Sequence, residues 1–193
     1  MKFSAPLFLL WGLSFSSFAD NLPQLIDISY SIKTGIGQGE LSESVKITQE
    51  ENTHRYKITS EAQAIGIMKI IKPGSITRNS QGLIIENGLR PTLFSDQRGN
   101  NNPSFARFDW ENNFITLHHE GEEIQKHLPT GTLDRLSLSY SFMFTPPPKE
   151  HLDVHITDGR GLELTHYTIQ EEKLTTPIGK LDTIVLTKQP TGS

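Results

Sequence analysis

Cysteine is absent from the 193 residues of this chain. Its absence excludes disulfide bridges, thiolate metal ligands and cysteine nucleophiles. Basic side chains are in the minority, because 18 Lys and Arg stand against 22 Asp and Glu and give a formal net charge of −4. Since no basic block interrupts this acidic balance, we expect the protein to bind neither nucleic acid nor an anionic membrane surface.

Long apolar runs are also lacking. The run Leu7–Leu13 is well short of the roughly 20 residues that a membrane-spanning helix needs. It follows Lys2 and precedes small residues ending at Ala19, which is the order of a secretory signal peptide. We therefore predict that residues 1–19 are cleaved after Ala19. Because the exported product has no Cys, we expect it in a bacterial periplasm and not spanning a membrane.

Short segments of alternating apolar and polar residues are what the chain has in abundance. Such alternation is typical of strands with one buried face, and the Gly, Asn and Pro clusters between the segments favour an antiparallel meander. The expected strands are 26–33, 41–48, 55–60, 64–71, 76 with 83–85, 106–110, 114–117, 124–128, 152–157, 162–169, 173–176 and 181–188. We expect residues 79–82 to interrupt a strand and residues 98–103 to form a loop.

The segment Leu128–Phe144 carries the one strong helix signal. Its apolar residues recur at steps of three and four along one helical face: Leu133, Leu136, Tyr140 and Met143. Thr132 is the expected N-cap, with Asp134 in the first turn, where a carboxylate suits the helix dipole. The prolines that begin at Pro146 end the helix.

These patterns predict a mainly β fold in which residues 20–193 form a single domain. We expect one curved antiparallel sheet or a partly open barrel, with one apolar helix, Leu133–Phe144, packed on it. Residues at the helix start and at two turns are expected to be structural: Asp134, Arg135, Asp158, Gly159, Pro177 and Gly179. Because the last strand, 181–188, would expose an unpaired edge, we expect the chain to be truncated at its C-terminus.

Candidate metal ligands are few. His118 and His119 are neighbours in a predicted strand, so their side chains point to opposite faces. His155 and His166 lie on opposite arms of the predicted Asp158-Gly159 hairpin and meet only if the strand register brings them together. Ordinary surface or half-buried histidines are the preferred interpretation, and we expect no metal ion.

Motifs for catalysis or for a cofactor are also weak. The glycine-rich run 35–39 precedes a strand, whereas a phosphate-binding loop would precede a helix. No serine lies in a Gly-x-Ser-x-Gly elbow. We therefore expect no cofactor and no catalytic residues, with a hydrolase whose carboxylates assemble in space as the remaining enzymatic alternative.

Four segments occur in a distinctive order: Gly88–Gly99, Phe105–Trp110, Leu128–Phe144 and Asp158–Lys188. Together they resemble a bacterial exported family, domain of unknown function 3108, which has a Leu-Pro-x-Gly-x-x-Asp-x-Leu-Ser helix start. That motif falls here on Leu128, Pro129, Gly131, Asp134, Leu136 and Ser137. Two later turn motifs of the family fall on Asp158, Gly159 and Arg160, and on Thr176, Pro177 and Gly179. The resemblance implies an exported β-rich protein without assigned catalytic residues, in a family whose members continue past the end of this chain.

The leading functional hypothesis is a non-enzymatic periplasmic binding or envelope-maintenance protein. A curved sheet with an apolar helix resembles the plan of small-ligand barrels, which is an analogy of fold alone. The expected partner is a hydrophobic small molecule or lipid that contacts the helix face formed by Leu133, Leu136, Tyr140 and Met143. The alternative is an interaction module that pairs exposed strand edges with an envelope protein.

Overall fold

The computed structural model describes residues 23–34, 37–66, 69, 74–176 and 179–190. The predicted signal peptide, residues 1–19, lies outside these ranges, and so does Pro177. Half of the predicted strand 64–71 and residues 35–36 of the glycine-rich run also lie outside them. The cleavage after Ala19 therefore stays a prediction.

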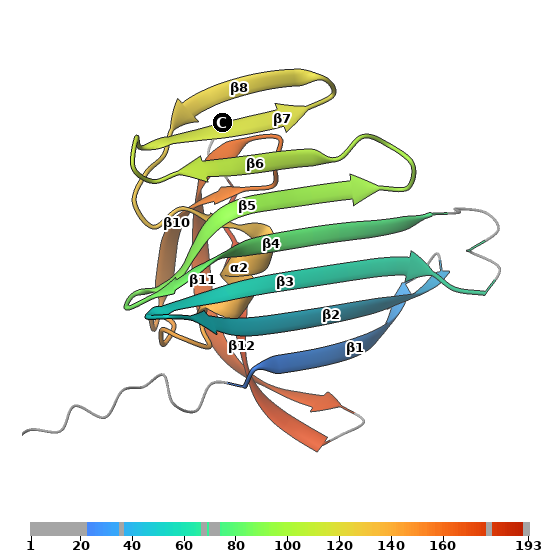
Figure 1. The fold of residues 1–193 in the computed structure, drawn as a ribbon. Coiled ribbons are helices and arrows are strands. Elements are labelled where there is room, and N and C mark those ends of the chain that lie inside the picture. Colours follow the sequence, from blue (N-terminus) through green and yellow to red (C-terminus); the bar gives the residue numbers. More distant parts are fainter. Residues whose placement is uncertain (1–22, 35–36, 67–68, 70–73, 177–178, 191–193) are drawn as a thin grey trace, which may run out of the picture.

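Eight antiparallel strands form the larger sheet, in which each strand pairs with its neighbour in the chain (Figure 1). These strands are β1 (Leu25–Thr34), β2 (Gly37–Glu50), β3 (Thr53–Ala64), β4 (Ser75–Ile85), β5 (Gly88–Arg98), β6 (Ser104–Asp109), β7 (Phe114–His119) and β8 (Glu122–His127). The predicted meander is confirmed, because sequence neighbours joined by short turns are neighbours in the sheet.

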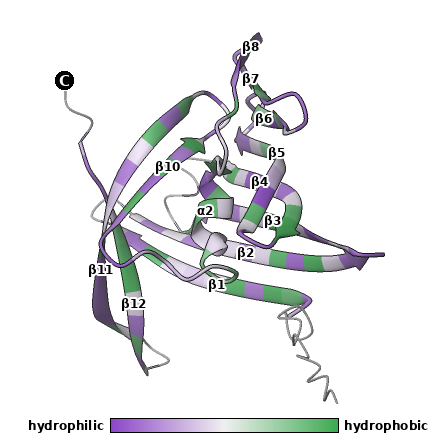
Figure 2. Cartoon of the chain, turned by 90° about the vertical axis from the view of Figure 1, so that its left-hand side faces the viewer, coloured by the Kyte–Doolittle hydropathy of each residue, from purple (hydrophilic) through white to green (hydrophobic). Residues whose placement is uncertain are grey.

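A second sheet has the order β12-β11-β10-β9. Its members are β9 (Leu133–Asp134), β10 (His151–Thr157), β11 (Leu162–Thr176) and β12 (Gly179–Lys188), and only β9 and β10 run parallel. Helix α2 (Arg135–Ser141) follows β9 directly. Figure 2 shows this helix between the curled second sheet and the larger sheet. The predicted mainly β fold, with a curved antiparallel sheet and an apolar helix packed on it, is confirmed.

Strands β4 and β5 differ from the sequence prediction. Residues 79–82, expected to interrupt a strand, lie inside β4. The register shifts between Gln81 and Gly82, so Thr92 of β5 has no paired residue on β4. Such a bulge absorbs residues of low strand propensity and tolerates Pro91, which lacks a backbone N–H. Strand β5 was not predicted, because its polar and proline-containing segment does not alternate.

The helix is shorter than predicted, and its N-cap is Asp134. The expected cap, Thr132, is wrong: its hydroxyl donates to the Pro129 carbonyl at 2.6 Å. The carboxylate of Asp134 accepts from the backbone N–H groups of Leu136 and Ser137, both at 2.9 Å. Residues 133–134 cannot be helical, because they are extended and pair with Ile156 and Thr157 of β10.

The hydrophobic core fills the space between the larger sheet and α2. Alternate residues of β2 and β3 supply Val45, Ile47, Tyr56 and Ile58, and the centre is completed by Phe94, Ala106, Ile115, Leu117 and Leu128. From the helix, Leu136 and Tyr140 pack against this cluster. Because β2 and β3 alternate between buried and solvated residues, the period-two pattern of their sequence is explained.

No helix within the described ranges is long and apolar enough to cross a membrane.

Candidate ligand-binding site

A cavity opens between the β4–β5 hairpin, the segments around α2, and β10. Its volume is about 770 Å³, within the range typical of small-molecule pockets. Its apolar lining residues are Ile85, Leu89, Trp110, Leu133, Leu138, Phe142, Pro146, Pro148, Leu152 and Val154. Its polar lining residues are Asn87, Arg90, Asn113, Thr130, Thr132, Ser141, Thr145, Asp153 and His155, with Gly131 completing the wall. We call this cavity the helix-flank pocket.

Trp110 forms a rigid part of the pocket wall. Its indole Nε1 donates to the carbonyl oxygen of Pro91 at 2.6 Å, which ties the tryptophan to the bulged stretch of β5. Its ring is stacked with that of Phe108 at a centroid distance of 5.9 Å. On the Trp110 ring lies the guanidinium of Arg90, with Cζ 5.0 Å from the centroid. The indole is therefore fixed from three sides.

The predicted ligand-binding residues of the helix do not lie together. Leu133 lines the helix-flank pocket. Leu136 and Tyr140 are buried in the core, whereas Met143 is 38% exposed and does not line the pocket. The helix presents Leu138, Ser141 and Phe142 to the cavity instead. These three also recur at steps of three and four, so the sequence held a signal for this second face.

Asp134, predicted to be structural, lies at the centre of a buried polar network. Besides capping α2, its Oδ2 accepts a hydrogen bond of 2.6 Å from the Ser80 hydroxyl of β4, and Ser80 in turn lies 3.2 Å from the Tyr56 hydroxyl. Burial raises the pKa of Asp134 to about 6, although hydrogen bonds from Ser80, Ser137 and Leu136 partly offset it. Burial likewise raises the pKa of the Tyr56 hydroxyl, with the Asp134 charge adding to the effect. The carboxyl thus ties the helix start to the sheet.

Arg135, the other predicted structural residue at the helix start, takes no part in this network. It is exposed and lines a second, more polar pocket of about 570 Å³ with Arg160, Glu163 and Lys188. In that pocket Lys188 Nζ lies 3.5 Å from Glu163 Oε2. The Asp134–Ser80 hydrogen bond, and not Arg135, therefore links the helix start to the sheet.

A second anchor of α2 is the hydroxyl of Tyr140, which donates to Glu43 Oε2 at 2.7 Å. We expect Tyr140→Phe to lower the free energy of unfolding by about 1.5 kcal/mol, the lower end for hydrogen bonds to charged groups, because the half-buried Glu43 loses its donor. Urea denaturation gives the value. The control is Tyr167→Phe, since within the described chain the Tyr167 hydroxyl has no hydrogen-bond partner. Equal losses in both variants would contradict the anchor.

The predicted turn residues lie where β10 meets β11. Asp158 Oδ1 accepts from the backbone N–H groups of Arg160 at 3.1 Å and Gly161 at 3.4 Å. Gly159 has a φ of +86°, and an added Cβ would lie 3.1 Å from the backbone nitrogen of Phe105. The turn therefore packs directly on β6. Gly179, with a φ of +125°, begins β12.

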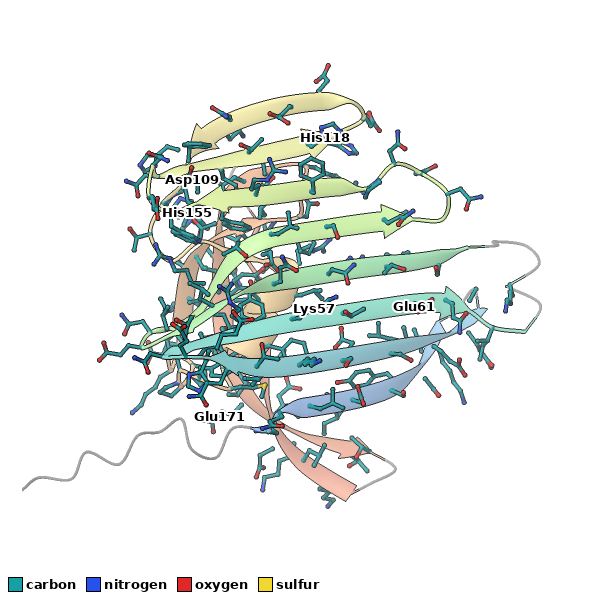
Figure 3. The ribbon with its side chains drawn as sticks, in the orientation of Figure 1. Lys57, Glu61, Asp109, His118, His155 and Glu171 are labelled. Carbon is teal, nitrogen blue, oxygen red and sulfur yellow. The ribbon has the colours of Figure 1, made fainter. Side chains whose placement is uncertain are left out.

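The histidines do not converge. His118 stacks on the Phe105 ring, whereas His119 Nε2 lies 3.5 Å from Glu120 Oε1. In Figure 3, His118 of β7 and His155 of β10 are drawn well apart from one another. The register places His155 opposite Leu164, and His166 Nδ1 lies 2.7 Å from Asp153 Oδ1. Across the described ranges, no three His, Cys, Asp or Glu side chains are grouped to hold a metal ion. The absence of catalysis stays a prediction.

Comparison with known proteins gives one family. The model described as "Protein of unknown function (DUF3108)" matches residues 26–193. No curated protein and no solved structure matches the chain.

Proposed function

This chain belongs to the DUF3108 family of proteins of unknown function, and on that premise we propose that it is a non-enzymatic binding protein for a hydrophobic or lipid-like molecule. The observation that carries the proposal is the helix-flank pocket, a cavity of about 770 Å³ whose wall is formed largely by aliphatic, aromatic and proline side chains. Burying apolar ligand surface is worth about 25 cal/mol per Å², so such a wall favours an apolar occupant.

The walls of the pocket are held in place by the rest of the protein, which supports a role in ligand binding. Leu89 and Val154 are 7% exposed each and are held by the strands on either side. Trp110 is fixed by its bond to Pro91. Because contacts within the protein hold these groups, binding costs less side-chain entropy than it would at a mobile surface.

We expect Leu152→Trp to weaken binding of the apolar fluorophore N-phenyl-1-naphthylamine at least tenfold. Leu152 lines the cavity, and an indole at this position fills space that the probe would occupy. The measurement is a fluorescence titration, with thermal unfolding to show that the variant is folded. The control is Leu164→Trp, because Leu164 on the neighbouring strand is 43% exposed and outside the pocket wall.

The proposal is wrong if the wild-type protein does not bind the fluorophore, or if Leu152→Trp binds it as wild type does. Native mass spectrometry of protein recovered from the periplasmic fraction of its host adds an independent readout. We expect a co-purifying apolar molecule, on a polypeptide whose mass corresponds to cleavage after Ala19.

A second candidate is pairing through strand edges. Within the described residues, β1 and β8 end the larger sheet, and β12 and the two-residue β9 end the second sheet. Near the tip of the β11–β12 hairpin, Leu174 and Leu181 lie opposite one another and are 55% and 41% exposed. Unpaired strand edges with apolar neighbours favour addition of a partner strand. Stoichiometric recovery of an envelope protein that leaves fluorophore binding unchanged would favour this candidate.

A further inference from the structure

The helix-flank pocket contains one permanent cation, Arg90. Its guanidinium lies over the Trp110 ring, and Arg90 has no ion pair with any carboxylate in the described part of the chain. Among the described residues, Asp153 is the only carboxylate in the pocket wall, and its Oδ1 lies 2.7 Å from His166 Nδ1. Within the described residues, the guanidinium of Arg90 is therefore not paired with a carboxylate of the wall.

The position of this guanidinium is fixed by its strand. Arg90 pairs with Leu83 in the β4–β5 register and directly precedes Pro91, which accepts the Trp110 indole N–H. Its neighbour Leu89 is buried in the same wall. The half-buried Arg90 thus combines a charged planar fork with an apolar surrounding. A guanidinium of this kind binds oxyanions through two parallel N–H···O bonds, which are stronger than neutral hydrogen bonds.

We propose that the ligand of this pocket is an anionic amphiphile, whose carboxylate-like head group binds Arg90 while its apolar chain lies along Leu138 and Phe142. The inference rests on the proposed function and specifies the chemical class of the ligand. An apolar wall alone does not discriminate between an alcohol and a carboxylate of equal chain length. A guanidinium without a carboxylate partner does discriminate between them, because only the carboxylate can form two charge-assisted hydrogen bonds with it.

The test compares dodecanoate with 1-dodecanol, each below the concentration at which it aggregates, as competitors of N-phenyl-1-naphthylamine at pH 8. We expect wild type to bind dodecanoate at least tenfold more tightly than dodecanol. In Arg90→Met this preference disappears, because the thioether keeps the apolar bulk and lacks the charge, while dodecanol binding changes less than twofold. Arg90→Lys keeps part of the preference, since an ammonium is a point charge without the fork.

The matched control is Arg135→Met, which removes an exposed arginine outside the helix-flank pocket and should keep the full preference. Equal affinities of wild type for the two competitors, or an unchanged preference in folded Arg90→Met, would overturn the inference and leave the binding function standing. Failure of the fluorophore itself to bind would instead overturn the proposed function. If Arg90→Met does not fold, Arg90→Lys decides. A reduced preference in Arg90→Lys, with the full preference kept in Arg135→Met, assigns the head group to the fork. An unreduced preference in Arg90→Lys overturns the inference.

Discussion

Replacing Gly82 by alanine should lower the free energy of unfolding by about 3 kcal/mol, the upper end of what overpacking costs. A Cβ at this position would collide with the carbonyl oxygen of Arg90 and would lie 2.8 Å from the Cα of Pro91. Both are backbone atoms of the paired strand, so neither can rotate away. The close approach exists because the register shifts at Gly82, which brings the two backbones together at the bulge.

Urea denaturation of the two proteins measures this loss. The matched control is Gly161→Ala, since a Cβ there has no atom within 4 Å. We expect the control to unfold within about 0.5 kcal/mol of wild type, as is usual for surface changes. A Gly82→Ala protein as stable as the control would show that the strands do not approach as described. If the variant is still folded, its dodecanoate preference reports whether Arg90 has moved.

Stability should also fall as the pH rises from 3.5 to 7.5, by about 3 kcal/mol through Asp134 alone. Burial raises the pKa of this carboxyl from 3.8 to about 6 in the folded protein. A group whose pKa is higher in the folded state than in the unfolded state binds its proton more tightly when folded. Its contribution to stability is therefore fully present below pH 3.8 and is lost as the pH rises through 6.

Asp134→Asn isolates this contribution, because the amide keeps an acceptor for the helix cap and cannot ionise. The difference in unfolding free energy between variant and wild type should grow in favour of the variant by about 3 kcal/mol from pH 3.5 to 7.5. Parallel pH curves for the two proteins would contradict the buried ionisation.

Asp96→Asn is the matched control of opposite sign. Burial alone would raise the pKa of Asp96, but hydrogen bonds and charges from Arg98 and Arg78 outweigh it and lower the pKa below 3.8. Wild type should therefore gain stability relative to this variant as the pH rises above the folded pKa of Asp96. As the pH rises to neutral, Asp96→Asn should lose stability relative to wild type, whereas Asp134→Asn should gain it. This opposite behaviour distinguishes the environments of the two carboxyl groups.

Much of the fold could be predicted, because β-strands with one buried face carry their own pattern. The hairpin of β6 and β7 followed from alternation on either side of a polar turn, and the β10–β11 hairpin from Asp158-Gly159. Strand β5 could not be predicted, since Pro91 and the unpaired Thr92 break the alternation. The position of a bulge depends on the register with the neighbouring strand, so the local sequence pattern does not predict it.

The candidate site was harder to predict, because α2 lies between two sheets. A helix covered on two sides has two apolar faces, and both repeat at steps of three and four. Leu136 and Tyr140 were assigned to the ligand but are buried in the core, while Leu138 and Phe142 line the pocket. Only the position of β10 determines which helix face lines the pocket and which packs in the core. Arg90 was likewise inaccessible to sequence reasoning, since its neighbour Trp110 is brought to it by the register of β5 with β6.

The order of strands in the larger sheet has a consequence for how the pocket is assembled. Each of its hairpins closes a short loop, and contacts of low sequence separation form at little entropic cost. The pocket instead joins the β4–β5 turn to α2 and β10, and its anchors link residues as distant as Asp134 with Ser80 and Tyr140 with Glu43. From contact order, we expect the meander to form early in folding and the pocket to form late. A bound amphiphile would thus act on the last contacts to form and would mainly retard unfolding.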